Sequence, residues 1–387
     1  MRSELDRPSA TARAVEPAFT FGIEEEYHLA NLDDGGLAAA PEPLKQAWSA
    51  ALGPSVSLEF LQSQIEVSTR VHTSFAEARR ELAHLRRTIA EIAAPYGIAP
   101  AAAGTYPLAK RNSTQPTEND RYVALATDLA GVGRRMLVSG MHVHVGIADN
   151  EVRIDLMNQA RYFVPHLLAL TTSSPFWETE PTGLKSFRSV IIDGLPRTGL
   201  PNRFTSWSEY EATVGVLIKT GVIDDASKVW WDLRPSGKHP TLELRALDVC
   251  TELDDAVAVA AIFVCLCRYL YRLRQLNQSW RDYPVFLIKE NRWRAQRYGV
   301  SGKLFDFGKG TLEPVGDLIG EILALIGPEA DAIGCRAEVA HACTIVARGT
   351  SADTQERLYA ERLAAGDPQD VALRAVADRV VSATANV

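Results

Sequence analysis

Four segments of the sequence alternate apolar and charged side chains, and this pattern constrains the fold more than any other feature. In FGIEEEYHLA, residues 21–30, three glutamates stand side by side in a stretch that otherwise predicts a β-strand. Side chains alternate across a strand, so Glu24 and Glu26 would share one face while Glu25 lies on the opposite, apolar face. Burying a carboxylate is costly, so Glu25 requires a basic or hydrogen-bonding partner, which the local sequence does not identify.

The other three segments each have one apolar edge and one charged edge. The charged edges carry His142 and His144 in SGMHVHVGI, Asp232 and Arg234 in WWDLRPS, and Glu243 and Arg245 in TLELRALD. A solvated sheet face would alternate in the same way, but it usually mixes lysine, threonine and serine. Glutamates gathered on one face repel each other unless cations neutralise them. The four strands together therefore predict a bound divalent metal.

The residue types on this face indicate which metal it holds and which chemistry it serves. Carboxylate oxygens with one or two imidazoles suit Mg²⁺ or Mn²⁺ better than zinc, which prefers histidine and cysteine. Arginines beside such a site suit phosphate, since the guanidinium fork binds oxyanions. The implied chemistry is phosphoryl transfer from a nucleotide, although the sequence contains neither a P-loop nor a dinucleotide motif. A zinc hydrolase built on His142 and His144 is the rival, and the shortage of further histidines counts against it.

The stretch SLEFLQSQIEVST, residues 57–69, adds Glu59 and Glu66 to the candidate ligands. Their odd interval cannot place both side chains on one face of a regular strand. If both bind metal, a bulge or a turn must therefore separate them. A two-turn helix would align them instead, but Ile65, Val67 and Thr69 favour a strand.

The remaining periodicity predicts strands separated by long helical blocks. Strands are expected over 18–29, 62–69, 98–103, 139–147, 229–234 and 241–247. Helices are expected over 74–93, 149–170, 253–276, 315–325 and 353–365. The last two strands form a hairpin that turns through Pro235, Ser236 and Gly237. This pattern predicts an α+β fold, in which a mainly antiparallel sheet carries helices on one face and chemistry on the other.

Composition sets outer limits on organisation and partners. The formal net charge of -7 gives no long-range attraction to nucleic acid or to anionic membranes, so small-molecule partners are expected. No linker divides the chain, and one domain is expected over residues 17–387 after a flexible tail of residues 1–16.

The five cysteines form no CxxC pair and indicate buried free thiols in a reducing cytoplasm. The apolar run 256–273 contains Arg268 and predicts a core helix rather than a membrane span.

Eight stretches in order along the chain resemble the type 2 glutamate–cysteine ligase family, in its bacterial carboxylate–amine ligase branch. They are FGIEEEYHL, LQSQIEVST, SGMHVHVG, PRTGLP, WWDLRPS, TLELRALD, ENRWRAQRYG and GTSADTQ. The resemblance implies a glutamine-synthetase-like catalytic fold, in which a curved antiparallel sheet holds two or three metals around the phosphates of ATP.

The resemblance also implies a role for particular side chains. The metal nearest the nucleotide phosphates would be held by Glu24, His142 and Glu243, and the metal facing the substrates by Glu26, Glu59 and Glu66. Arg245 would contact the transferring phosphoryl group, assisted by Arg234. Further substrate or nucleotide contacts would come from Arg188, Arg197, Asn291, Arg292 and Arg294. A structural turn is the alternative for Arg197, a solvated basic stripe is the alternative for Arg294, and a hydrogen-bonding role is expected for His144.

The function implied by the resemblance is an ATP-dependent ligase. It would join the γ-carboxyl group of glutamate, or of a similar acid, to cysteine or another amine through an acyl phosphate. None of the cysteines of this chain would be catalytic. The alternative is a non-catalytic ATP-binding regulator with the same fold. A homodimer is also expected, because related proteins often associate.

Overall fold

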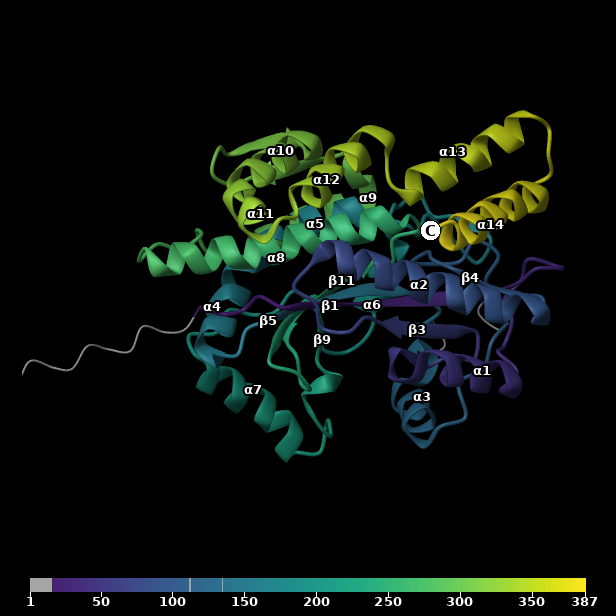
Figure 1. The fold of residues 1–387 in the computed structure, drawn as a ribbon, viewed down its shortest axis with the longest axis horizontal. Helices are drawn as coiled ribbons and strands as arrows, with labels where there is room; N and C mark the ends of the chain where they lie inside the picture. The colour runs from purple at the N-terminus through teal and green to yellow at the C-terminus, as the bar shows by residue number, and fades with distance from the viewer. Residues whose placement is uncertain (1–15, 111–112, 134) are drawn as a thin grey trace, which may run out of the picture.

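The computed structural model describes residues 16–110, 113–133 and 135–387, and within them a seven-stranded antiparallel sheet lies at the centre (Figure 1). The predicted tail, apart from Glu16, lies outside the described residues. The strand order is β10-β11-β5-β1-β3-β2, and β4 pairs with the end of β1. The strands are β1 (Phe21–Asn31), β2 (Val56–Leu58), β3 (Gln64–Ser68), β4 (Ile98–Ala101), β5 (Gly140–Gly146), β10 (Leu233–Pro235) and β11 (Thr241–Asp248).

Helices α2 (Phe75–Ala93) and α8 (Leu253–Gln275) run together along one face of the sheet, whereas α7 lies on the opposite side (Figure 1). The other helices are α1 (Glu42–Leu52), α3 (Asp120–Gly133), α4 (Asn150–Ala160), α5 (Val164–Thr171), α6 (Phe187–Asp193), α7 (Trp207–Lys219), α9 (Val285–Tyr298), α10 (Val315–Leu325), α11 (Gly327–Ile333), α12 (Arg336–Arg348), α13 (Ser351–Ala364) and α14 (Gln369–Ala385). Three small ladders complete the fold, formed by β6 (Phe176–Trp177) with β7 (Glu180–Pro181), β8 (Thr198–Gly199) with β9 (Trp230–Trp231), and β12 (Lys303–Asp306) with β13 (Thr311–Pro314).

The apolar edges of the alternating strands form the core beneath α2 and α8. Ile23 of β1 lies opposite Val143 of β5, which lies opposite Leu244 of β11, and all three side chains are fully buried. Burying a side chain of this size contributes about 1.5–3 kcal/mol. The predicted α+β fold with an antiparallel sheet is therefore confirmed.

Helix α8 is the one helix in the described ranges that is long and apolar enough to cross a membrane. In the fold, however, 83% of its most apolar window is buried inside the protein. It packs against α2, α4 and α12 and against β5. The expected core helix is therefore what the structure contains.

The buried glutamate of β1 finds its partner on α2. Arg86 Nε and Nη2 donate to the two carboxylate oxygens of Glu25 at 2.9 and 2.6 Å, and both side chains are fully buried. Arg86 also donates to two backbone carbonyls at 2.8 Å, and the Tyr27 hydroxyl donates to Glu25. The sequence does contain a signal for this partner, because Arg86 falls in the apolar stripe of α2 between Leu82 and Ile89.

Two predicted elements differ in detail from the observed ones. The helix expected over 149–170 is divided into α4 and α5 by a 3₁₀ turn at Arg161–Phe163, because Pro165 in the first turn of α5 has no N–H to continue the hydrogen-bond ladder. In the predicted hairpin, Asp232 leaves the ladder. Its carbonyl accepts hydrogen bonds from the N–H groups of Arg245 and Ala246 at 2.8 and 3.2 Å, where the β11 register shifts.

Candidate active site

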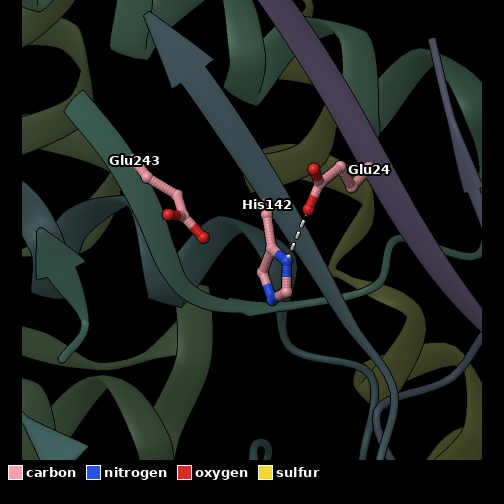
Figure 2. Close-up of side chains that lie close together, drawn as sticks. All are labelled: Glu24, His142 and Glu243. Atoms are coloured by element: carbon pink, nitrogen blue, oxygen red, sulfur yellow. Dashed lines mark hydrogen bonds and ion pairs between the residues drawn. The ribbon is translucent and has the colours of Figure 1, made fainter. Parts of the chain in front are cut away.

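Three adjacent strands bring together a first acidic group, here called the Glu24 cluster (Glu24, His142 and Glu243). In the sheet register Glu24 lies opposite His142, and Glu243 lies opposite His144. Figure 2 shows the three side chains of the cluster pointing toward one another. His142 Nδ1 lies 3.1 Å from Glu24 Oε2. One possible ligand atom from each residue lies within 4.8 Å of the others. Ligands about 2.1 Å from Mg²⁺ lie at most about 4.2 Å apart, so small side-chain adjustments would bring these atoms onto one ion.

A second group, here called the Glu26 cluster (Glu26, Glu66 and His142), lies next to the first and shares its imidazole. Glu26 of β1 lies opposite Glu66 of β3, and His142 Nε2 is 3.8 Å from Glu26 Oε1. One ligand atom from each of the three residues again lies within 4.8 Å of the others. The Gly140 N–H donates to Glu26 at 2.6 Å, and the Ser57 hydroxyl donates to Glu66 at 2.9 Å.

A turn separates Glu59 from Glu66, as their odd interval requires. Strand β2 ends at Leu58 and pairs with β3, so that Ser57 lies opposite Glu66. Glu59 follows directly and lines the same cavity as the two clusters. Its carboxylate accepts the Phe60 N–H at 3.2 Å. Glu59 therefore stands beside the Glu26 cluster without being one of its three closely spaced members.

Negative charge accumulates at the Glu26 cluster. Burial, reinforced by the charges of Glu24 and Glu26, raises the pKa of Glu66 to about 7. Burial and the neighbouring charges of Glu66 and Glu26 also raise the pKa of Glu59 well above its usual range. The neighbouring carboxylates contribute to both shifts, and a cation bound in this part of the cavity would offset their repulsion.

The pKa of the Glu24 carboxyl group is shifted in the opposite direction, downward. Burial alone would raise its pKa, but hydrogen bonds with His142 and His144 outweigh burial and hold the pKa well below its usual range. His144 Nε2 lies 3.2 Å from Glu24 Oε1, and its Nδ1 forms a hydrogen bond of 2.9 Å with the Thr241 hydroxyl. The hydrogen-bonding role expected for His144 thus includes contact with a candidate ligand.

Two arginines hold Glu243 in its ionised form. Arg234 Nε and Nη2 donate to Glu243 at 2.9 and 3.1 Å, and Arg245 Nη1 forms an ion pair with the same carboxylate. Burial raises the pKa of Glu243, but these two guanidinium charges outweigh it and lower the pKa below the usual range. Arg234 is fixed further by the carbonyls of Ser227 and Val229 at 2.8 and 2.5 Å. Arg245 is more accessible, with 21% of its side chain exposed.

The six candidate ligands, His144 and the two arginines line one cavity of about 420 Å³, which is large enough for a small organic ligand. The remaining charged or titratable groups on its wall are Arg188, Lys228, Asp232, Lys238, His239 and Arg292. The cavity therefore has acidic clusters on the sheet and cationic groups on the segments that flank it.

Arg188 of α6 is a buried cation that forms no ion pair within the part of the chain that the structure describes. It is 5% exposed, and its Nη atoms lie 3.4 Å from the backbone carbonyls of Arg245 and Ala246. Among the described residues, no carboxylate forms an ion pair with it, and its Nε has no hydrogen-bond partner. Gly140 permits this approach, since a Cβ there would lie 2.2 Å from Arg188 Nη2.

Asp248, which was not among the predicted site residues, fixes the position of Arg188 through Ser174. This fully buried carboxylate accepts the hydroxyl hydrogens of Ser174 and Ser186 at 2.6 and 2.8 Å. Ser174 Oγ in turn accepts the Arg188 N–H at 3.1 Å. The only sequence signal was the acidic end of TLELRALD, and no local rule links it to α6.

Arg292 lies on the cavity wall, but internal acids already occupy its guanidinium group. Its Nη1 is 2.5 Å from Asp193 Oδ2, and its Nε and Nη2 are 2.7 and 3.1 Å from the two oxygens of Asp232. Its guanidinium group is therefore held in place by two acids, and the expected contact with a substrate anion stays a prediction.

Three other predicted contacts lie outside the cavity wall. Asn291 exchanges hydrogen bonds of 2.6 and 2.8 Å with the backbone of β12, and Arg294 donates to another carbonyl of that strand at 2.5 Å. Arg197 donates to the carbonyl of Lys228 at 2.9 Å and stacks over the Trp230 ring. These side chains hold neighbouring segments together, which agrees with the structural alternative for Arg197, and the predicted substrate contacts of all three stay predictions.

Solved structures of known proteins share this fold. The crystal structure of glutamate–cysteine ligase from Francisella tularensis in complex with AMP has a TM-score of 0.68 at 16% identity, covering 96% of this chain and 90% of that one. A bifunctional glutathione synthetase from Pasteurella multocida gives a TM-score of 0.67 at 19% identity, covering 95% of this chain and 52% of that one. These similarities define the structural class of the chain, which has the antiparallel-sheet fold of both proteins.

Sequence comparison identifies the family within that class. The family model for glutamate–cysteine ligase family 2 matches residues 20–375. A protein from Rhodospirillum rubrum, named provisionally as glutamate–cysteine ligase 2, is 54% identical over 374 residues, covering 95% of this chain and 96% of that one. A Jannaschia protein with the same provisional name is 48% identical over 363 residues, covering 94% and 96%. The chain belongs to glutamate–cysteine ligase family 2.

Proposed function

We propose that the chain is an ATP-dependent carboxylate–amine ligase, which joins the γ-carboxyl group of glutamate to cysteine or another amino compound. The observation that carries this proposal is one cavity in which two carboxylate clusters share His142 and face Arg245. Family membership supports the ligase class. The AMP in the Francisella structure supports an adenine nucleotide as co-substrate.

The donor atoms fit Mg²⁺ or Mn²⁺. The two clusters offer carboxylate oxygens and a single shared imidazole, which is a hard, oxygen-rich set. We assign one ion to the Glu24 cluster and a second ion to the Glu26 cluster with Glu59. When bound, the ions would offset the repulsion between the phosphate oxygens and the attacking carboxylate.

The proposed reaction consists of two displacements. A γ-carboxylate oxygen of glutamate attacks the γ-phosphorus of ATP, and ADP leaves with its bonding electron pair. The amine then attacks the acyl carbon, phosphate leaves, and the amine loses a proton. Arg245 would stabilise the charge on the transferring phosphoryl group, while Arg234 holds Glu243 in place.

Arg188 is suited to a second anionic group on the acid substrate. A buried guanidinium group without a carboxylate partner is unfavourable, and a bound anion would relieve this cost. The α-carboxylate of glutamate would supply that anion. Arg188 would then select an acid with two carboxylates.

The proposed partners are ATP, an acid and an amine in the cytoplasm, with no nucleic acid or membrane. We also propose a homodimer. Size-exclusion chromatography with light scattering would reject the dimer if the mass came out near 42.4 kDa.

The function is tested by ADP release from ATP and Mg²⁺ over a panel of acids crossed with amines. Glu24→Gln removes a charge from the Glu24 cluster, and Glu361→Gln is its matched control, because Glu361 is exposed on α13. We expect one pair to stimulate ADP release, with a loss of about 10²-fold or more in Glu24→Gln and none in the control.

Two other outcomes would favour a different function. ATP binding without stimulation by any pair would favour the regulator. Hydrolysis without ATP, restored by zinc after chelation, would favour the metal-dependent hydrolase.

A further inference from the structure

A second cavity, of about 480 Å³, lies in the helical layer and shares no lining residue with the acidic one. Its walls come from the 3₁₀ turn Arg161–Phe163, from α5, α8 and α10, from the segment 276–284 and from the β12–β13 hairpin. In Figure 1 α5, α8 and α10 lie on the side of the sheet opposite α7. This second cavity is here called the aromatic cavity.

One wall of this cavity is aromatic. The Tyr162 ring lies 5.4 Å from the Trp280 ring and 5.4 Å from the Tyr283 ring, measured between centroids. Tyr269 and Leu273 extend the wall along α8. Rings in this arrangement bind apolar and aromatic groups and attract organic cations to their faces.

Two carboxylates of the aromatic cavity share one exposed lysine. Lys309 Nζ lies 3.4 Å from Asp306 Oδ2 and 2.5 Å from Glu321 Oε1, and 48% of the Lys309 side chain is exposed. Asp306 Oδ1 also accepts the N–H groups of Gly308 and Lys309, and two acids against one exposed cation leave a negative charge that favours a positive group on a ligand. Arg281, an exposed residue on the same wall, has no ion-pair partner among the described residues, and it favours a negative group.

One buried polar atom on this wall has no hydrogen-bond partner among the described residues. It is the Nε1–H of Trp280. Buried polar groups are rarely left unsatisfied, so this atom indicates a bound ligand with a polar group. His166 lies on the same wall and is 1% exposed, with the backbone of Tyr162 and Phe163 beside its ring.

We propose that the aromatic cavity binds a zwitterionic amino acid with an aromatic or large apolar side chain. Its ammonium group would meet Asp306 and His166, and its carboxylate would meet Arg281 and the Trp280 Nε1–H. Its side chain would lie against Tyr162. This inference goes beyond the proposed ligase reaction and does not depend on it.

The test is calorimetric binding of L-phenylalanine to the full-length protein without ATP or metal. Two truncated probes serve as comparisons: 3-phenylpropanoate lacks the ammonium group, and 2-phenylethylamine lacks the carboxylate. We expect L-phenylalanine to bind, with each truncated probe about tenfold weaker or worse, because each loses one charge-assisted contact.

Three variants locate the site. Asp306→Asn should weaken binding about tenfold, and Arg281→Gln should weaken it severalfold with no risk to the fold, because Arg281 is exposed. Lys309→Gln should instead tighten binding, because it removes the cation that competes for Asp306 and Glu321. Tighter binding in Lys309→Gln would not result from destabilisation of the fold, because destabilisation would weaken binding.

The proposal is overturned if L-phenylalanine does not bind, or if either truncated probe binds as tightly. It is also overturned if Arg281→Gln and Lys309→Gln both leave affinity unchanged. Binding that survives Asp306→Asn but is lost in Arg188→Gln would place the amino acid in the acidic cavity. That result would reject this site without affecting the proposed ligase function.

Discussion

At the scale of single residues, the role of a buried charge depends on which groups pack against it. Arg188 and Arg292 are both buried on the wall of the acidic cavity, and both were expected to contact a substrate or the nucleotide. Arg292 is paired with Asp193 and Asp232, whereas Arg188 has no acidic partner among the described residues. The sequence could not separate the two, because these partners come from segments far away along the chain.

Arg188 should therefore affect substrate binding more than folding. We expect Arg188→Gln to raise KM for the acid substrate at least about tenfold, with a smaller effect on KM for ATP, because it removes a charge-assisted hydrogen bond. Arg188→Lys should restore part of the affinity for the acid, since it keeps the positive charge but loses the paired N–H donors of the guanidinium group. Steady-state kinetics on both variants provide the check, and an unchanged KM for the acid would contradict the assignment.

Glu66 should make metal binding depend on pH. In the metal-free protein, burial with the charges of Glu24 and Glu26 raises the pKa of Glu66 to about 7, so below this pH a metal must displace a proton. The affinity for Mg²⁺ or Mn²⁺ should rise as the pH increases through about 7, and Glu59, whose pKa is also raised, should add to this rise. Calorimetry at pH 6 in buffers of different ionisation enthalpy should show proton release. Affinity that does not change between about pH 5.5 and 7.5 would argue against metal at this carboxylate.

At the scale of secondary-structure elements, the sequence predicted strands and their faces better than helices. Alternation of side chains predicts the apolar and the charged side of β1, β5 and β11. Because these strands pair with each other, their charged sides form much of the wall of the acidic cavity. Helix α7 was not predicted, because Thr213, Val214 and Ile218 are branched residues that disfavour a helix. A usable signal was present at its start, where the Ser206 side chain caps the N–H of Glu209.

The contact between β1 and α2 supplies a test of stability at this scale. Arg86→Met should lower the free energy of unfolding by about 3–5 kcal/mol, because it leaves the Glu25 carboxylate buried without its partner. The double variant Glu25→Leu with Arg86→Met should recover most of that loss, because neither charge remains. Urea denaturation measures both variants. If the single variant lost less than about 1 kcal/mol, the pair would not be holding the strand to the helix.

At the scale of the whole molecule, the sheet divides the protein by function. One face packs against α2 and α8 (Figure 1) and forms the core, as the buried residues show. The acidic clusters line the cavity on the other face. This division could be predicted from the sequence, because alternation assigns every strand residue to one face or the other. The positions of Arg188, Arg292 and the aromatic cavity could not, because they depend on how helices and loops pack around the sheet.

The central claim is that the carboxylate attacks ATP directly to form an acyl phosphate. The most direct measurement uses the acid that best stimulates ADP release, labelled with ¹⁸O in its carboxyl groups, and determines the isotope in the phosphate released with the amide product. The acyl-phosphate route predicts one ¹⁸O atom transferred to phosphate per turnover, because the attacking oxygen leaves with phosphorus. Phosphate that carries no ¹⁸O while the amide product forms would contradict the claim.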